Sequence, residues 1–268
     1  MSSRCSLAAA AIVACAVAAA QGPAPARPAA RHDGAAELHP FSPGEEMGFD
    51  VDFRRLRAAR VRFLIGRAQG PVWPLILQGR SDGIVALFDV REHFVSYWDS
   101  ATGLPRGSEL NAIEIGDRHT DRTRFDRASG RASVQVIRGG RIVERSVRIP
   151  ADVQDLLSSM MHLRGQRLEP GDRIEYPVFS GEYVFTVRAE VEGTEVLTTP
   201  AGRFDTVRVR AQLGFRTRFK PKGYSYVWLS NDVRHLPVRL TGSFAVGSVR
   251  ATLVRYRPGE WPVTSRQE

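Results

Sequence analysis

The sequence predicts a mainly β protein: a single antiparallel meander that forms a curved sheet or a half-closed barrel, with one helix packed against it. From residue 46 onward the apolar residues mostly alternate with polar ones, which is typical of strands with one buried face. Turn residues follow at short intervals, and short links between consecutive strands imply antiparallel pairing. Only one segment, residues 150 to 165, has clear helical spacing.

Short turns separate the predicted strands, as at Arg138-Gly139-Gly140-Arg141 and at Pro200-Ala201-Gly202. These short links argue against a parallel α/β fold. The predicted strands cover residues 46–53, 60–67, 73–80, 83–88, 91–98, 109–115, 119–125, 131–137, 142–148, 173–178, 183–191, 194–199, 203–212, 215–219, 224–230, 236–243 and 248–256.

The predicted helix covers about residues 151 to 164. Its apolar stripe consists of Val153, Leu156, Leu157, Met160 and Leu163. Asp152 is a suitable N-cap and Gly165 a suitable stop. Because the helix stands alone among strands, we expect its stripe to pack on the sheet and cover part of it.

Residues 1 to 20 have the features of a secretory signal peptide. Arg4 precedes a run of small apolar residues, and Ala18-Ala19-Ala20 provides an A-x-A cleavage site. A second interpretation competes, because the sequence ending at Cys15 is similar to a bacterial lipobox, in which this cysteine is lipidated. Cys5 and Cys15 are the only cysteines, so a disulfide in the mature domain is not expected.

The remaining chain divides into three parts. Residues 21 to 43 are rich in proline and alanine and predict a disordered tether. Residues 44 to 257 form the β-rich domain, and residues 258 to 268 a C-terminal tail. With 268 residues and an apolar fraction of 43%, the chain can bury a core of its own.

The formal net charge of +9 favours anionic partners. Anionic lipid head groups, polyanionic glycans and an acidic protein face all fit this charge. Export takes the chain away from nucleic acid, so no nucleic-acid partner is expected. A lipid anchor at Cys15 is the expected route to membrane association, and the expected location is periplasmic or outer-membrane-associated in a Gram-negative bacterium.

Several stretches together resemble a family of exported bacterial proteins, the domain of unknown function family 3108. They occur in the family's order over about residues 44 to 257: GEEMGFDVDF, IVALFDVREHFVSYWDSATGLP, VQDLLSSMMHLR, LEPGDRIEYPVFSGEYVFTVRAEVEGTEVLTTPAGRFDTVRV, VWLSNDVRHLPVRL and GSVRATLVRY. The resemblance implies an antiparallel, β-rich envelope protein and carries no established activity.

Candidate catalytic groups share one face of the predicted helix: Asp155, Ser158, Ser159 and His162. A Ser-His-Asp hydrolase needs a serine beside a base and an oriented carboxylate. One straight helix provides no oxyanion hole, and no G-x-S-x-G motif occurs in the chain. We therefore expect a solvated or network-forming helix face and name no catalytic residue.

Neither a metal nor a cofactor is expected. The histidines are scattered, and only His119 and Asp121 suggest a pair of ligands on one strand face. Carboxylates are numerous between Asp89 and Asp126, as a glycoside hydrolase requires, but arginines lie among them. A charge-paired sheet surface is the preferred interpretation of that region.

Two sets of residues are candidates for ligand binding. The predicted anion-binding residues are Arg208, Arg210, Arg216, Arg218 and Lys220. The alternative for these cations is a solvated edge that resists aggregation. The predicted lining of a site for a lipid-like ligand, between the sheet and the helix, consists of Phe88, Phe94, Trp98, Met160, Phe179, Phe185 and Trp228. The alternative is that these large apolar residues fill the core.

The predicted function is that of an exported, non-enzymatic envelope protein, a binding or assembly module for a lipid-like ligand or an envelope partner. One alternative is a hydrolase that acts on an envelope glycan or ester. A second alternative is a purely structural interaction protein.

Overall fold

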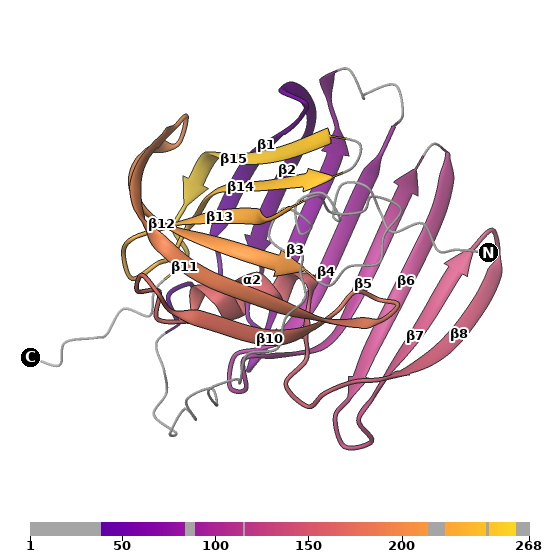
Figure 1. The fold of residues 1–268 in the computed structure, drawn as a ribbon. Coiled ribbons are helices and arrows are strands. Elements are labelled where there is room, and N and C mark those ends of the chain that lie inside the picture. The colour runs from indigo at the N-terminus through magenta and orange to yellow at the C-terminus, as the bar shows by residue number, and fades with distance from the viewer. Residues whose placement is uncertain (1–38, 84–88, 115, 214–222, 245–246, 261–268) are drawn as a thin grey trace, which may run out of the picture.

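The computed structural model describes residues 39–83, 89–114, 116–213, 223–244 and 247–260. These residues form one curved, open sheet with a single helix inside its curve (Figure 1), which confirms the predicted fold class. The strands are β1 (Glu46–Phe53), β2 (Leu56–Ile65), β3 (Val72–Ser81), β4 (Arg91–Asp99), β5 (Leu104–Glu114), β6 (Asp117–Asp126), β7 (Arg131–Arg138), β8 (Arg141–Arg148), β9 (Gln154–Asp155), β10 (Arg173–Phe179), β11 (Val184–Thr199), β12 (Gly202–Leu213), β13 (Ser225–Ser230), β14 (Pro237–Phe244) and β15 (Gly247–Arg257), and the helix is α2 (Leu156–Arg164).

The sheet order follows the chain in two meanders that meet at its middle. Strands β1 to β8 run outward in one direction and β15 to β10 in the other, because β1 pairs with β15. All pairs of long strands are antiparallel, and β9 adds a two-residue parallel pairing to β10. The sheet order therefore ends at β8 on one side and at β9 on the other, and the sheet curves without joining these ends.

Helix α2 lies in the curve of the sheet and contacts strands from both halves, namely β3, β4 and β10 (Figure 1). Leu157, Met161 and Leu163 on the helix are buried in the main core. The helix is also fixed by polar contacts, since the Ser96 hydroxyl on β4 donates to Asp155 and the Tyr176 hydroxyl on β10 donates to the carbonyl of Ser159. It is thus an internal support of the fold.

A second, smaller core joins β6 to β8 with the β9–β10 region. Phe125 and Phe179 meet edge to face with ring centroids 5.8 Å apart, and Ala132, Val134, Ile149 and Val153 complete the cluster. The strands β6 to β8 reach beyond the main core, so we call them the wing. The second core attaches the wing at one end of its inner face.

The structure corrects two local predictions. The helix begins at Leu156, because Asp155 rather than Asp152 is the N-cap: its side chain accepts from the backbone N–H groups of Leu157 and Ser158. The predicted tether is also too long, since Phe41 is buried and its ring stacks with His39 at 5.5 Å. These residues belong to the folded domain.

Candidate functional site

The predicted lipid-binding residues do not line one cavity. Phe94, Trp98 and Phe185 are buried in the main core, and Met160 packs against it. Phe179 lies in the second core. Their side chains thus fill space between the helix and the sheet, as the alternative interpretation expects, and Phe88 lies outside the described residues.

Trp228 lies on the opposite face of the sheet from the core. On β13 its neighbours Val227 and Leu229 are buried in the main core, and successive strand residues point to opposite faces. The indole N–H of Trp228 donates to Glu195 at 2.7 Å on the outer face. The prediction that Trp228 faces the helix is therefore wrong.

The two predicted anion-binding arginines that the structure describes are paired with acidic side chains. Arg208 contacts Glu192 at 2.9 Å and Arg210 contacts Glu190 at 2.6 Å. Both arginines lie on β12, which is an inner strand of the sheet and not an edge. The other three predicted cations, Arg216, Arg218 and Lys220, lie outside the described residues.

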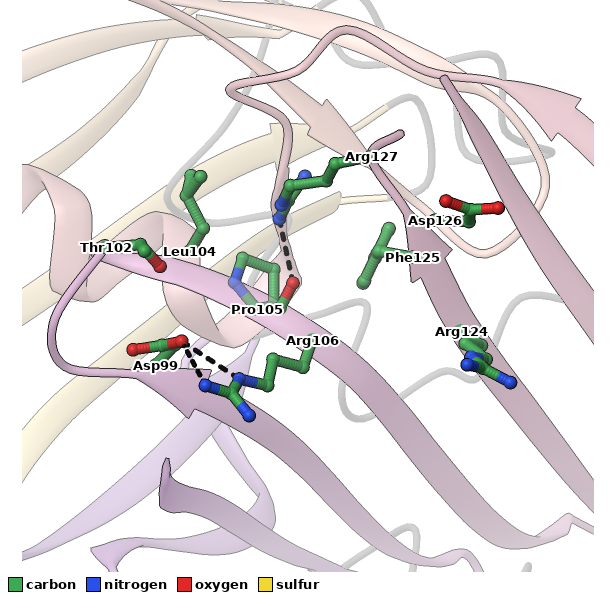
Figure 2. Close-up of a pocket in the computed structure, with 9 residues that line it drawn as sticks. All are labelled: Asp99, Thr102, Leu104, Pro105, Arg106, Arg124, Phe125, Asp126 and Arg127. Atoms are coloured by element: carbon green, nitrogen blue, oxygen red, sulfur yellow. Dashed lines mark hydrogen bonds and ion pairs between the residues drawn. The ribbon is translucent and has the colours of Figure 1, made fainter. Parts of the chain in front are cut away.

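An open pocket of about 510 Å³ lies where β5 begins and β6 ends (Figure 2). Leu104, Pro105 and Phe125 contribute apolar surface. The other lining residues are polar: Asp99, Thr102, Arg106, Arg124, Asp126 and Arg127. We call this cavity the arginine pocket, because three of its lining residues are arginines.

The contacts of Arg106 and Arg127 fix two of these guanidinium groups in place. Arg106 donates twice to Asp99, at 2.7 and 2.9 Å (Figure 2). Arg127 donates to the backbone carbonyls of Pro105, Ala151 and Val153, and its half-buried position lowers its pKa. Arg127 thereby connects β5 to the segment that leads into α2.

Arg124 is an exposed cation of the pocket, and its charge acts on Asp126. The carboxylate of Asp126 accepts hydrogen bonds from Ser129 and from the backbone of Ala128, and these bonds, Ser129 first, lower its pKa. Within the described part of the chain no hydrogen bond or ion pair engages Arg124. Its guanidinium is available to a ligand, whereas those of Arg106 and Arg127 are already oriented.

The candidate catalytic face of the helix is used for structure. Asp155 and Ser158 form a reciprocal capping box, and both are buried. The hydroxyl of Ser159 donates to the carbonyl of Leu156, and His162 packs against Tyr176 at 4.6 Å. The face is a hydrogen-bonded network, which is one of the two forms that the sequence predicts, and it is not the solvated one.

His119 and Asp121 share one strand face, as predicted, and this face is the inner side of the wing. Arg138 contacts His119 at 3.2 Å, and burial raises the pKa of Asp121. Among the described residues no group of three or more histidine, cysteine or acidic side chains is arranged to hold a metal ion. In the same part of the chain, no helix is both long and apolar enough to cross a membrane.

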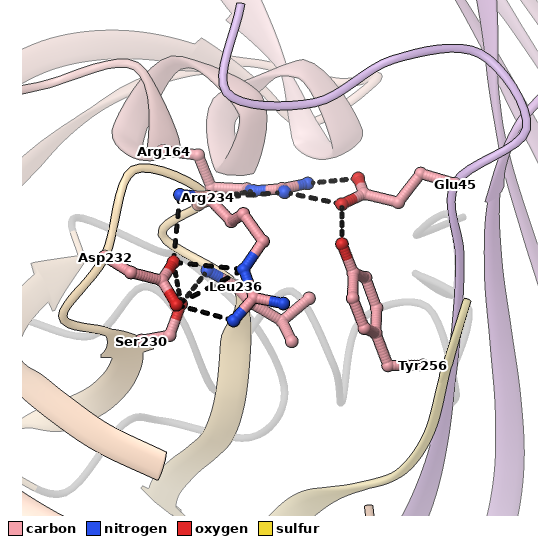
Figure 3. A network of polar contacts seen from close by, with 7 residues as sticks. All are labelled: Glu45, Arg164, Ser230, Asp232, Arg234, Leu236 and Tyr256. Carbon is pink, nitrogen blue, oxygen red and sulfur yellow. Dashed lines mark hydrogen bonds and ion pairs between the residues drawn. The ribbon is translucent and has the colours of Figure 1, made fainter. Parts of the chain in front are cut away.

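The sequence analysis missed a buried polar network at the C-terminal end of α2 (Figure 3). Arg164 is completely buried and forms a bidentate ion pair with Glu45 at 2.7 and 2.8 Å. The Tyr256 hydroxyl donates to the same carboxylate, and Arg164 donates to the carbonyl of Arg234. The sequence signal for this network was an arginine in the last helical turn, directly before Gly165. The partners of that arginine are distant in sequence, so the signal did not show the network.

These features define a β-rich protein with a partly closed, helix-filled barrel and an arginine-lined surface pocket. The chain belongs to the family described as "Protein of unknown function (DUF3108)", whose model matches residues 48 to 254. This confirms the resemblance found in the sequence.

One solved structure shares the fold at low sequence identity, and two others have lower structural similarity. A β-barrel-like protein of the domain of unknown function DUF1849 from Brucella abortus has 8% identity, a TM-score of 0.55, and coverage of 82% of this chain and 99% of its own. A presumed exported protein with a YmcC-like fold from Bacteroides fragilis has 10% identity, a TM-score of 0.33, and coverage of 81% and 97%. A presumed lipoprotein from Parabacteroides distasonis has 12% identity, a TM-score of 0.32, and coverage of 82% and 98%. No curated protein matches the chain in sequence.

Proposed function

We propose that this protein is an exported, non-enzymatic binding module of the Gram-negative cell envelope, periplasmic or associated with the outer membrane. The N-terminal segment supports export, by cleavage after Ala20 or by lipidation at Cys15. The proposed ligand is an anionic amphiphile, a molecule with an acyl-like chain and an anionic head group. The arginine pocket is its proposed site.

One observation carries this proposal: three arginines and three apolar residues line the arginine pocket. Guanidinium groups bind phosphate and carboxylate oxygens with paired, charge-assisted hydrogen bonds. Leu104 and Phe125 offer apolar surface to a chain, and burial of that surface is favourable. Arg124, which is exposed, would complete the contact with the head group.

Titration of the purified protein with decyl phosphate below its micellar concentration tests the proposal. Inorganic phosphate and decanol serve as controls that carry only the head group or only the chain. We expect saturable binding of decyl phosphate and binding at least tenfold weaker in Arg124→Glu. The matched control is Arg122→Glu, on the same strand and face but paired with Glu109 outside the pocket.

Equal losses of decyl phosphate affinity in Arg124→Glu and Arg122→Glu would show a general charge effect and overturn the assignment of the site. Absence of saturable decyl phosphate binding, with far-ultraviolet circular dichroism showing folded protein, would also overturn it. A purely structural interaction protein would then be the better description.

A further inference from the structure

The outer face of the sheet over β13, β14 and β15 carries positive charge with little compensation. Arg239 and Arg250 point to this face, whereas Leu240, Val249 and Ala251 beside them point into the core. The sequences of these three strands contain no aspartate or glutamate. The two arginines are diagonal neighbours, because Arg239 pairs with Thr252 and Arg250 with Thr241.

Like charges on adjacent strands repel one another, so an anion bound between these two arginines would be stabilising. The Arg239 Nε is buried and has no hydrogen-bond partner among the described residues. Burial, together with the nearby charge of Arg250, lowers the pKa of Arg239. A buried N–H without a partner costs free energy that a bound anion would recover.

The nearest acidic side chains already have other partners. Glu195 exerts an attractive effect on Arg239, but it accepts the indole N–H of Trp228 and lies 3.6 Å from Arg208. Asp52 is the cross-strand neighbour of Arg250, and it interacts with Arg57 at 3.7 Å. Neither carboxylate therefore forms an ion pair with Arg239 or Arg250 among the described contacts.

An aromatic platform lies directly beside Arg239. Trp228 is its cross-strand neighbour on β13, and Tyr226 follows on the same face with a centroid distance of 5.9 Å to Trp228. The hydrogen bond from Trp228 to Glu195 holds the indole ring in place, and Arg208 lies over the Tyr226 ring. A flat, partly apolar ring is a suitable partner for such a surface because stacking buries apolar area.

We propose that this outer face binds an anionic sugar, whose phosphate or carboxylate bridges Arg239 and Arg250 while its ring stacks on Trp228. The site is separate from the arginine pocket, which lies on β5 and β6. Arg210 on the neighbouring strand β12 is paired with Glu190 and forms no part of it.

Isothermal titration calorimetry with four probes tests this site. Glucose 6-phosphate and glucuronate carry a ring with a phosphate or a carboxylate, glucose carries the ring alone, and inorganic phosphate carries the anion alone. We expect at least one charged sugar to bind tenfold or more tightly than glucose and inorganic phosphate. The preferred charged sugar identifies the head group.

Three variants localise the binding. Arg239→Gln should lower the affinity for the preferred charged sugar at least tenfold. Trp228→Leu should lower that affinity to the value measured for the anion without a ring. Arg255→Gln is the matched control, because Arg255 is an exposed arginine farther along β15. It should change the affinity less than twofold.

Equal affinity for glucose and both charged sugars would overturn the proposal, as would an equal loss in Arg255→Gln and Arg239→Gln. No binding of any charged sugar to folded protein would overturn it as well. Decyl phosphate binding, which depends on Arg124, is a separate readout, so failure here is distinguishable from failure of the proposed function.

Discussion

The ion pair between Arg164 and Glu45 shows how single residues fix this fold. Both side chains are almost fully shielded, with exposed fractions of 0% and 2%. Arg164 also lies over the Phe41 ring at 4.9 Å. It donates to the backbone carbonyl of Arg234 as well, and Figure 3 shows both arginines in this network. One side chain therefore joins the helix, the N-terminal entry and the β13–β14 turn.

Substitution of one partner of this pair should be strongly destabilising. Arg164→Met leaves the Glu45 carboxylate buried without its partner, which costs about 3 to 5 kcal/mol of unfolding free energy. Urea denaturation of the wild type and the variant measures this loss. The double variant Glu45→Leu/Arg164→Met should lose less than the sum of the two single variants, and a strictly additive loss would contradict a direct interaction.

Asp155 predicts a specific dependence of stability on pH. Burial raises its pKa above the ordinary 3.8, although Ser96 and the helix N–H groups donate to it. The folded state holds this proton more tightly than the unfolded state does. Protonation of Asp155 therefore contributes its full amount to the stability below pH 3.8, and this contribution is lost as the pH rises through the folded pKa. Asp155→Asn cannot titrate and retains a capping oxygen.

We therefore expect the wild type to lose stability relative to Asp155→Asn between pH 4 and pH 7. Denaturation of both proteins across this range gives the difference in unfolding free energy at each pH. A difference that stays constant, or that changes in favour of the wild type as the pH rises, would contradict the raised pKa.

At the scale of elements, the wing depends on its small apolar contact with β10. Phe179→Ala should cost about 3 to 5 kcal/mol, because it removes a buried ring that meets Phe125 edge to face. Hydrogen exchange should rise more in β6 to β8 than in β1 to β3. Ile142→Ser is the control, since Ile142 is 60% exposed on β8 and should change stability by no more than about 0.5 kcal/mol.

A uniform rise in exchange over the whole sheet would show that the wing and the main core unfold as one unit. No change in exchange would show that the second core does not hold the wing. Either result would contradict this account of the attachment.

The elements were largely predictable because their signals are local. The alternation of apolar and polar residues, together with the turn residues, locates most strands. The start of α2 depends instead on the pairing of Gln154 and Asp155 with β10, which is distant in sequence. The site was less predictable. The run from Tyr226 to Leu229 is apolar throughout, so its hydrophobic pattern does not show which side chains are buried. The glutamate partner of Arg208 lies on a neighbouring strand, so the sequence around Arg208 does not show that this arginine is paired.

At the scale of the whole molecule, the curved sheet surrounds a helix and leaves its surfaces for recognition. The main core contains side chains from both meanders and from α2, so the fold is held together from within. The outer face of β13 to β15 is built on strands of this sheet, and the arginine pocket on strands β5 and β6 and the turns beside them. Rigid strands can position such side chains more precisely than loops.

The central claim is that an anionic amphiphile binds at the arginine pocket and not between the sheet and the helix. Titration of isotope-labelled protein with decyl phosphate, followed by amide chemical shifts in nuclear magnetic resonance, tests it most directly. The account predicts saturable shifts concentrated at residues 104–107 and 124–127. Saturable shifts concentrated instead around Phe94, Met160 and Phe185 would place the ligand inside the sheet and contradict the account.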